Sequence, residues 1–96
     1  MKPLALTGSL RKAIQRCVWF ESPEVAVSDP AKVAAYIFTY GSVEDVSALR
    51  EQYDEEDIKA VLDAAPPGIY DPRSWAYWNL IVGRYTQPAM PTRRLG

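Results

Sequence analysis

The chain has 96 residues, of which 48% are hydrophobic and 24% charged, so it has room for one hydrophobic core and no second domain. It contains no apolar run near the roughly 20 residues of a membrane span and no signal-peptide pattern at its start, so we expect a cytoplasmic protein. The net charge of −1 conceals an asymmetry, with +4 over residues 1–20, −8 over 21–65 and +3 over 66–96.

The first predicted helix carries an apolar stripe from Leu10 to Val18. Thr7 or Ser9 is expected to cap its start, because a short side-chain oxygen accepts the free backbone N–H groups there. The pair Ser22-Pro23 is expected to end this element. Apolar residues recur along it at spacings of three and four, as in one buried helical stripe: Leu10, Ala13, Ile14, Cys17 and Val18.

The next two predicted helices follow clear start signals. Asp29 is a good N-cap, and Pro30 suits the first helical position because its missing N–H had no partner there. Gly41 is expected to close this helix in the left-handed conformation. Ser42 followed by Asp45 resembles a short capping box and predicts another helix start.

Two more helices are predicted in the second half of the chain. Asp54 caps the first of them, and the acidic run 54–57 lies at the positive end of its dipole. Residues 66–68, Pro-Pro-Gly, end it. A second Asp-Pro pair at 71–72 opens the last helix, which ends at Gly83.

The fold class is therefore predicted as all-α. We expect a compact bundle of about five short helices over residues 1–83, followed by an extended tail over 84–96 that is rich in Pro and Arg. The β-branched residues mostly occur at helical spacings, which gives little support to strands.

The residue inventory offers little for catalysis. The chain has no His and one Cys, which removes the commonest general base and metal ligand and excludes an intramolecular disulfide. The five glycines form no phosphate-binding loop. The acidic run 54–57 fits helix capping better than a metal site, because it lacks the alternating oxygen ligands of a calcium loop. We expect no enzyme, cofactor, metal or small-molecule substrate.

The last helix and the tail are the most distinctive part of the chain. No charge occurs between Arg73 and Arg84, and a helix that is apolar nearly all round is either central to the core or partly covered by another molecule. Two tryptophans also suit the core of a small domain, and a terminal tail is often disordered. The partner-binding residues predicted from this region are Trp75, Tyr77, Trp78, Arg84, Tyr85, Arg93 and Arg94.

Three stretches carry a resemblance to a known family. They are the pair Trp19-Phe20, residues 36–65 and, above all, residues 68–95. In these the chain resembles small helical bacterial proteins that are encoded beside an abortive-infection-type nucleotidyltransferase and are presumed to be its antitoxin. The resemblance implies a partner protein, the nucleotidyltransferase toxin, and no active site of its own. The acidic segment 21–65 fits a basic partner surface.

Two other functions stay open at the level of sequence. One is a small nucleic-acid-binding regulator that uses the basic face of the first helix, Arg11, Lys12 and Arg16, together with the C-terminal arginines. Three or four cations are a small footprint for that role. The other is a phage-type protein inhibitor of a nucleic-acid enzyme.

Overall fold

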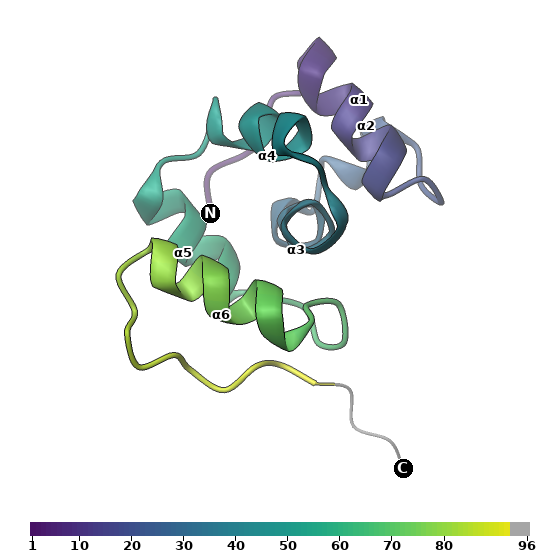
Figure 1. The fold of residues 1–96 in the computed structure, drawn as a ribbon. Coiled ribbons are helices and arrows are strands. Elements are labelled where there is room, and N and C mark those ends of the chain that lie inside the picture. The colour runs from purple at the N-terminus through teal and green to yellow at the C-terminus, as the bar shows by residue number, and fades with distance from the viewer. Residues whose placement is uncertain (93–96) are drawn as a thin grey trace.

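The computed structural model describes residues 1–92, which form six helices and no strand (Figure 1). The all-α prediction is confirmed. The predicted tail residues Arg93 and Arg94 lie outside the described residues. In chain order the helices are α1 (Gly8–Cys17), α2 (Pro23–Ala26), α3 (Pro30–Tyr40), α4 (Val43–Arg50), α5 (Glu55–Asp63) and α6 (Pro72–Ile81).

The predicted helix starts are confirmed at the level of single hydrogen bonds. In each, the side-chain oxygen of the N-cap residue accepts the backbone N–H three residues later, which satisfies a donor that has no partner within the helix. Two of the starts are complete capping boxes, formed by Ser42 with Asp45 and by Asp54 with Asp57. The N-cap residues of the five predicted helices are Thr7, Asp29, Ser42, Asp54 and Asp71.

Two local predictions are wrong. The pair Ser22-Pro23 does not only end the first element: Ser22 caps α2, a single helical turn with Pro23 at its first position, which accounts for the sixth helix. Gly41 is not left-handed but extended, with φ −77° and ψ 156°. Glycine is required there by space, because a Cβ on Gly41 would lie 2.6 Å from the carbonyl oxygen of Ile37.

Helix α3 is the centre of the molecule. It contacts each of the other five helices, which surround it when it is viewed along its axis (Figure 1). Its buried apolar residues cover a wide face, so the core forms on several of its sides, and the face that carries Tyr36 and Tyr40 lies outside the core. The largest aliphatic side chains that meet there are Leu10, Ile14, Ile37, Leu49, Ile58 and Leu62.

The segment before α1 is held by the turn between α4 and α5. The side-chain amide of Gln52 accepts a hydrogen bond from the backbone N–H of Ala5 at 2.7 Å and donates to the carbonyl oxygen of the same residue at 2.8 Å. The hydroxyl of the buried Tyr53 donates to the carbonyl oxygen of Lys2. These bonds tie the start of the chain to residues about 50 positions away.

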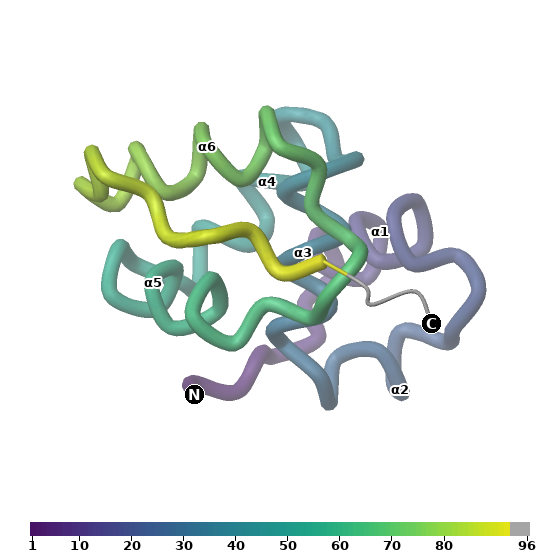
Figure 2. Tube along the Cα trace, turned by 90° about the horizontal axis from the view of Figure 1, so that it is seen from below, coloured from purple at the N-terminus to yellow at the C-terminus, as the bar shows by residue number. Residues whose placement is uncertain are grey.

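The described part of the tail runs back along α6 instead of leaving the domain (Figure 2). The indole N–H of Trp75 donates to the carbonyl oxygen of Pro88 at 2.8 Å. The backbone N–H of Gly68 donates to the carbonyl oxygen of Pro91 at 3.4 Å. Met90 packs against the core. The extended conformation predicted for the tail is therefore held by contacts with the helical domain as far as Pro91.

Candidate functional site

The two tryptophans of α6 belong to the core. Trp75 is 4% exposed and Trp78 is 5% exposed, which corrects the expectation that their indoles form part of an exposed anchor. Trp78 stacks on Phe38 with ring centroids 3.9 Å apart, and its indole N–H donates to the carbonyl oxygen of Phe38 at 3.3 Å. The stripe that carries the two tryptophans is covered by α3 and by the tail, whereas Tyr77 and Leu80 on another side of α6 stay 55% and 54% exposed.

The other predicted binding residues divide into two groups. Arg84 is engaged within the chain: it pairs with Asp63 at 2.9 Å and donates to the side-chain oxygen of Asn79 at 3.3 Å. It therefore holds the start of the tail against α5 and α6. Tyr77 and Tyr85 keep exposed rings, at 55% and 88%. They lie apart from the larger aromatic cluster described next.

Four aromatic side chains from the end of α1 and from α3 form one continuous contact chain. Trp19 meets Phe20 with ring centroids 5.6 Å apart, Phe20 meets Tyr36 at 5.4 Å, and Tyr36 meets Tyr40 at 6.1 Å. Trp19 is 77% exposed, Phe20 49% and Tyr40 66%. We call these four residues the aromatic patch.

The backbone explains why these rings point outward. Helix α1 ends at Cys17 and Val18 enters the core, so the two aromatic residues that follow lie in an exposed turn. Tyr36 and Tyr40 are four residues apart on α3 and share the face opposite to its buried stripe. Sequence reasoning missed this patch. The available signal was the adjacent pair Trp19-Phe20 directly after a predicted helix.

A buried carboxylate supports the edge of the aromatic patch. Asp45 accepts from the Nε of Arg16 at 2.9 Å and from the backbone N–H of Ser42 at 3.0 Å. Burial alone would raise the pKa of Asp45, but the hydrogen bonds from Arg16 and Ser42 outweigh it and the pKa is lowered. Arg16 and Cys17 line a hollow of about 360 Å³ with the four aromatic rings.

Cys17 is a poor nucleophile in this setting. Burial raises the pKa of its thiol to about 11, and the carboxylate of Asp45, which accepts from its Sγ at 3.7 Å, acts in the same direction. A thiol with such a pKa is almost wholly protonated near neutral pH. Cys17 therefore contributes packing below the patch.

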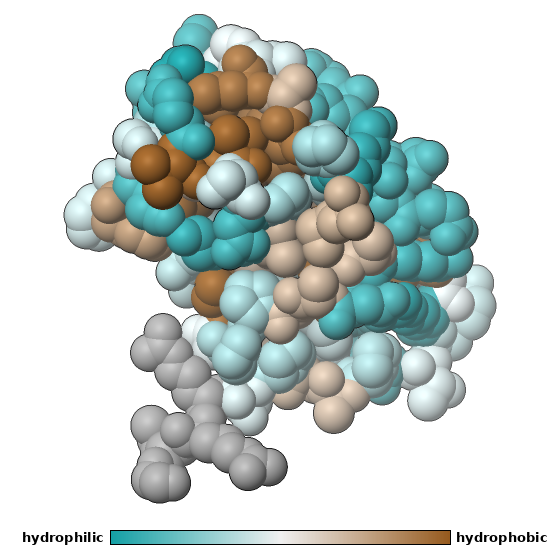
Figure 3. All heavy atoms as spheres, turned by 180° about the vertical axis from the view of Figure 1, so that it is seen from behind, coloured by the Kyte–Doolittle hydropathy of each residue, from teal (hydrophilic) through white to brown (hydrophobic). Residues whose placement is uncertain are grey.

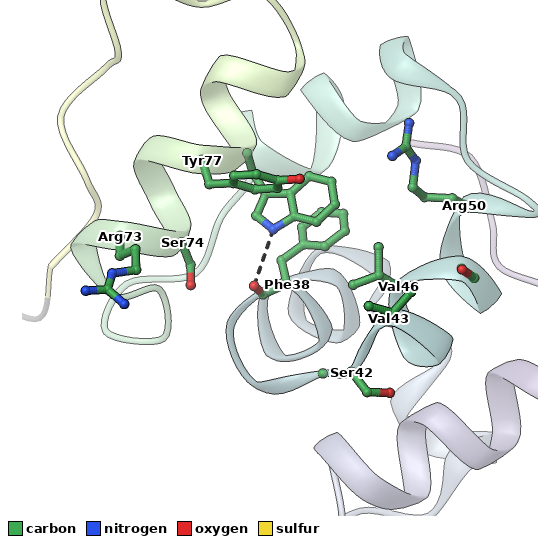
Figure 4. A pocket seen from close by; sticks show the side chains of 11 residues that line it. Phe38, Ser42, Val43, Val46, Arg50, Arg73, Ser74 and Tyr77 are labelled. Carbon is green, nitrogen blue, oxygen red and sulfur yellow. Dashed lines mark hydrogen bonds between the residues drawn. The ribbon is translucent and has the colours of Figure 1, made fainter.

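A second hollow, larger than the one beside the aromatic patch, lies between α4 and α6, above the ring pair of Phe38 and Trp78 (Figure 4). Its volume is about 500 Å³. Tyr77 stands on one side and Val43 and Val46 on the other (Figure 4). We call it the α4–α6 groove; its remaining lining residues are Gly41, Ser42, Ser47, Arg50, Arg73 and Ser74.

A third apolar area lies on the far face of the molecule. Seen from behind, hydrophobic surface gathers toward the end formed by α1 and α2 (Figure 3). Val25 of α2 is 60% exposed. Polar side chains break up this area (Figure 3).

Among the described residues, no three His, Cys, Asp or Glu side chains are placed so that they could hold one metal ion together. No helix among them is long and apolar enough to cross a membrane. The acids that begin the helices serve instead as caps, as Asp54 and Asp71 do. Comparison of the chain with protein-family models, with curated proteins and with solved structures finds no match. The antitoxin assignment stays a prediction.

Proposed function

We propose that this chain is a non-catalytic, cytoplasmic protein-binding module, and that it acts as an antitoxin which neutralises a nucleotidyltransferase by direct contact through the aromatic patch. The exposed contact chain from Trp19 to Tyr40 is the observation that carries the proposal. The identity of the partner rests on the sequence resemblance described above.

Aromatic rings are efficient anchors for a protein partner. A Trp or Tyr buries a large area on binding and has few rotatable bonds to immobilise, so it dominates many interfaces. In the patch the rings already hold one another at 5.4 to 6.1 Å, so part of their ordering is complete before a partner arrives. Trp19 gains the most from being covered, because it is 77% exposed.

The acidic segment 21–65 supports the proposal, but with fewer available carboxylates than the sequence suggested. Asp45 is buried and Asp63 pairs with Arg84, so neither is available to a partner as the sequence suggested. Exposed carboxylates remain at the starts of α4 and α5 and between them. They favour encounter with a basic surface, such as the cleft of an enzyme that acts on RNA. These residues are Glu44, Glu51 and Glu55. Glu56 is exposed as well but pairs with Lys59 at 3.1 Å.

The alternative of nucleic-acid binding has less support. Arg11 of α1 pairs with Glu24 at 2.6 Å, and Arg16 of the same helix pairs with Asp45. Cations that are already paired add little to phosphate binding. A mobility-shift experiment with DNA and RNA at low salt tests this alternative, since phosphate contacts are strongest there.

The proposed function is tested by co-expression with the product of the neighbouring gene, which the proposal expects to be a nucleotidyltransferase, followed by pull-down and growth measurement. Replacing Trp19 and Tyr40 by Ala together should weaken binding by about 30-fold or more and abolish protection. Leu80→Ala is the control, because that apolar side chain is 54% exposed and lies outside the patch. Wild-type binding and protection by the double variant would refute the proposed interface.

A further inference from the structure

We propose that the α4–α6 groove is a second binding site, and that it takes an acidic segment of a partner protein in which apolar side chains lie between carboxylates. This proposal does not depend on the aromatic patch or on the antitoxin assignment. It is argued from the charge, the lining and the shape of the groove.

The charge of the groove is opposite to that of the sequence around it. Residues 21–65 carry a net charge of −8, yet the lining of the groove contains two arginines and no Asp or Glu. Arg50 and Arg73 lie at different sides of the groove (Figure 4). Within residues 1–92 neither guanidinium forms an ion pair.

The acids nearest in sequence to these cations are engaged elsewhere. Glu51, next to Arg50, accepts from the hydroxyl of Ser9 at 3.3 Å and does not line the groove. Asp71 accepts the backbone N–H of Ser74 at 2.7 Å as the cap of α6, and it does not line the groove. Arg73 lowers the pKa of Asp71 only as a minor contribution behind that capping interaction. The guanidinium groups of Arg50 and Arg73 are therefore available for carboxylates from outside, as charge-assisted hydrogen bonds.

The middle of the groove requires an apolar occupant. The floor is the ring pair of Phe38 and Trp78, and the sides are raised by Val43, which is 84% exposed, and by Tyr77, which is 55% exposed. Apolar side chains placed there would cover both Val43 and Tyr77.

The same features favour a protein segment over a nucleic acid. Two separated cations supply few phosphate contacts, whereas an apolar centre with a cation on each side matches a peptide in which leucines are flanked by glutamates. The volume of about 500 Å³ is enough for two such apolar side chains, and the hydroxyls of Ser47 and Ser74 offer hydrogen bonds to its backbone.

The test uses fluorescence anisotropy with a labelled synthetic peptide in which two leucines lie between pairs of glutamates, and with its glutamine twin. The acidic peptide should bind. In an NMR titration of the protein with this peptide, the largest shifts of backbone amide signals should occur at Val43, Val46 and Tyr77. Arg50→Gln and Arg73→Gln should each weaken binding by about tenfold. Lys12→Gln is the control, since it removes one exposed cation outside the groove.

A further variant avoids any effect on folding. Val43→Glu places a carboxylate at an exposed position of the groove and should abolish binding of the acidic peptide while leaving the unfolding midpoint unchanged. Trp19→Ala should leave peptide binding intact, which separates this site from the aromatic patch.

Four results would overturn the proposal. They are equal binding of the glutamine twin, no binding at millimolar peptide, tighter binding of inorganic phosphate or a nucleotide than of the peptide, and concentration-dependent self-association that Arg50→Gln or Arg73→Gln abolishes. The third result would assign the groove to a small anion, and the last would assign it to a second copy of this chain.

Discussion

Replacing Trp78 by Phe separates the two contributions that this residue makes to the core. Its ring stacks on Phe38 between α3 and α6, and its N–H donates to the Phe38 carbonyl oxygen at 3.3 Å. That carbonyl belongs to the last turn of α3, where carbonyl groups lack partners within the helix. If the helix continued, this carbonyl would accept from the N–H four residues later, that of Ser42. That N–H instead donates to the side chain of Asp45. A Phe at position 78 keeps most of the stack and removes the donor.

The expected loss of stability follows from that missing donor. A buried carbonyl left without a partner costs about 1–3 kcal/mol, and the smaller ring adds a cavity term. We therefore expect the free energy of unfolding to fall by about 2–3 kcal/mol, out of a total of about 5–14 kcal/mol for a domain of this length. At about 4–8 °C for each kcal/mol, the Tm should fall by about 10–20 °C.

Thermal and urea unfolding followed by circular dichroism at the helix band measure this change. Trp19→Phe is the matched control, because that ring is 77% exposed, and its Tm should stay near that of the unaltered chain. Trp78→Ala should lose about 3–5 kcal/mol, since it also removes the stack. If Trp78→Phe unfolds within a few degrees of the unaltered chain, the indole is not the partner that holds the end of α3.

Three further predictions concern single residues. Gly41→Ala should lower the free energy of unfolding by about 1–3 kcal/mol, because its Cβ meets a backbone carbonyl at 2.6 Å, whereas Gly8→Ala has open space and should not; equal urea midpoints would contradict this. The pKa of Asp45 is lowered in the folded state, so its stabilisation is complete above the usual carboxyl pKa and is lost as the pH falls through the lower folded pKa. In Asp45→Asn the urea midpoint should therefore fall less with decreasing pH than in the unaltered chain. Identical pH profiles of the two proteins would show that Asp45 does not contribute this stabilisation. Cys17, with a pKa of about 11, should react with iodoacetamide only on unfolding in urea, so rapid native alkylation would show that it is accessible.

The positions of the helices could be predicted from the sequence because their start signals are local. An N-cap oxygen bonds a backbone N–H three residues away, so Asp29, Ser42, Asp54 and Asp71 act without help from distant parts of the chain. The short helix α2 was missed because Ser22-Pro23 can follow one helix and begin another.

The surfaces were decided by the tertiary structure. The sequence shows that α6 is apolar nearly all round, but whether Trp75 and Trp78 are exposed depends on α3 and on a tail that returns along the helix. The requirement for glycine at position 41 likewise comes from packing against its neighbours.

The aromatic patch and the α4–α6 groove join residues that are distant in the chain, Trp19 with Tyr40 and Arg50 with Arg73. Hydrogen bonds within one turn are determined by neighbours in the sequence. Which apolar faces cover one another, and which are left for a partner, is determined by the packing of all the helices around α3.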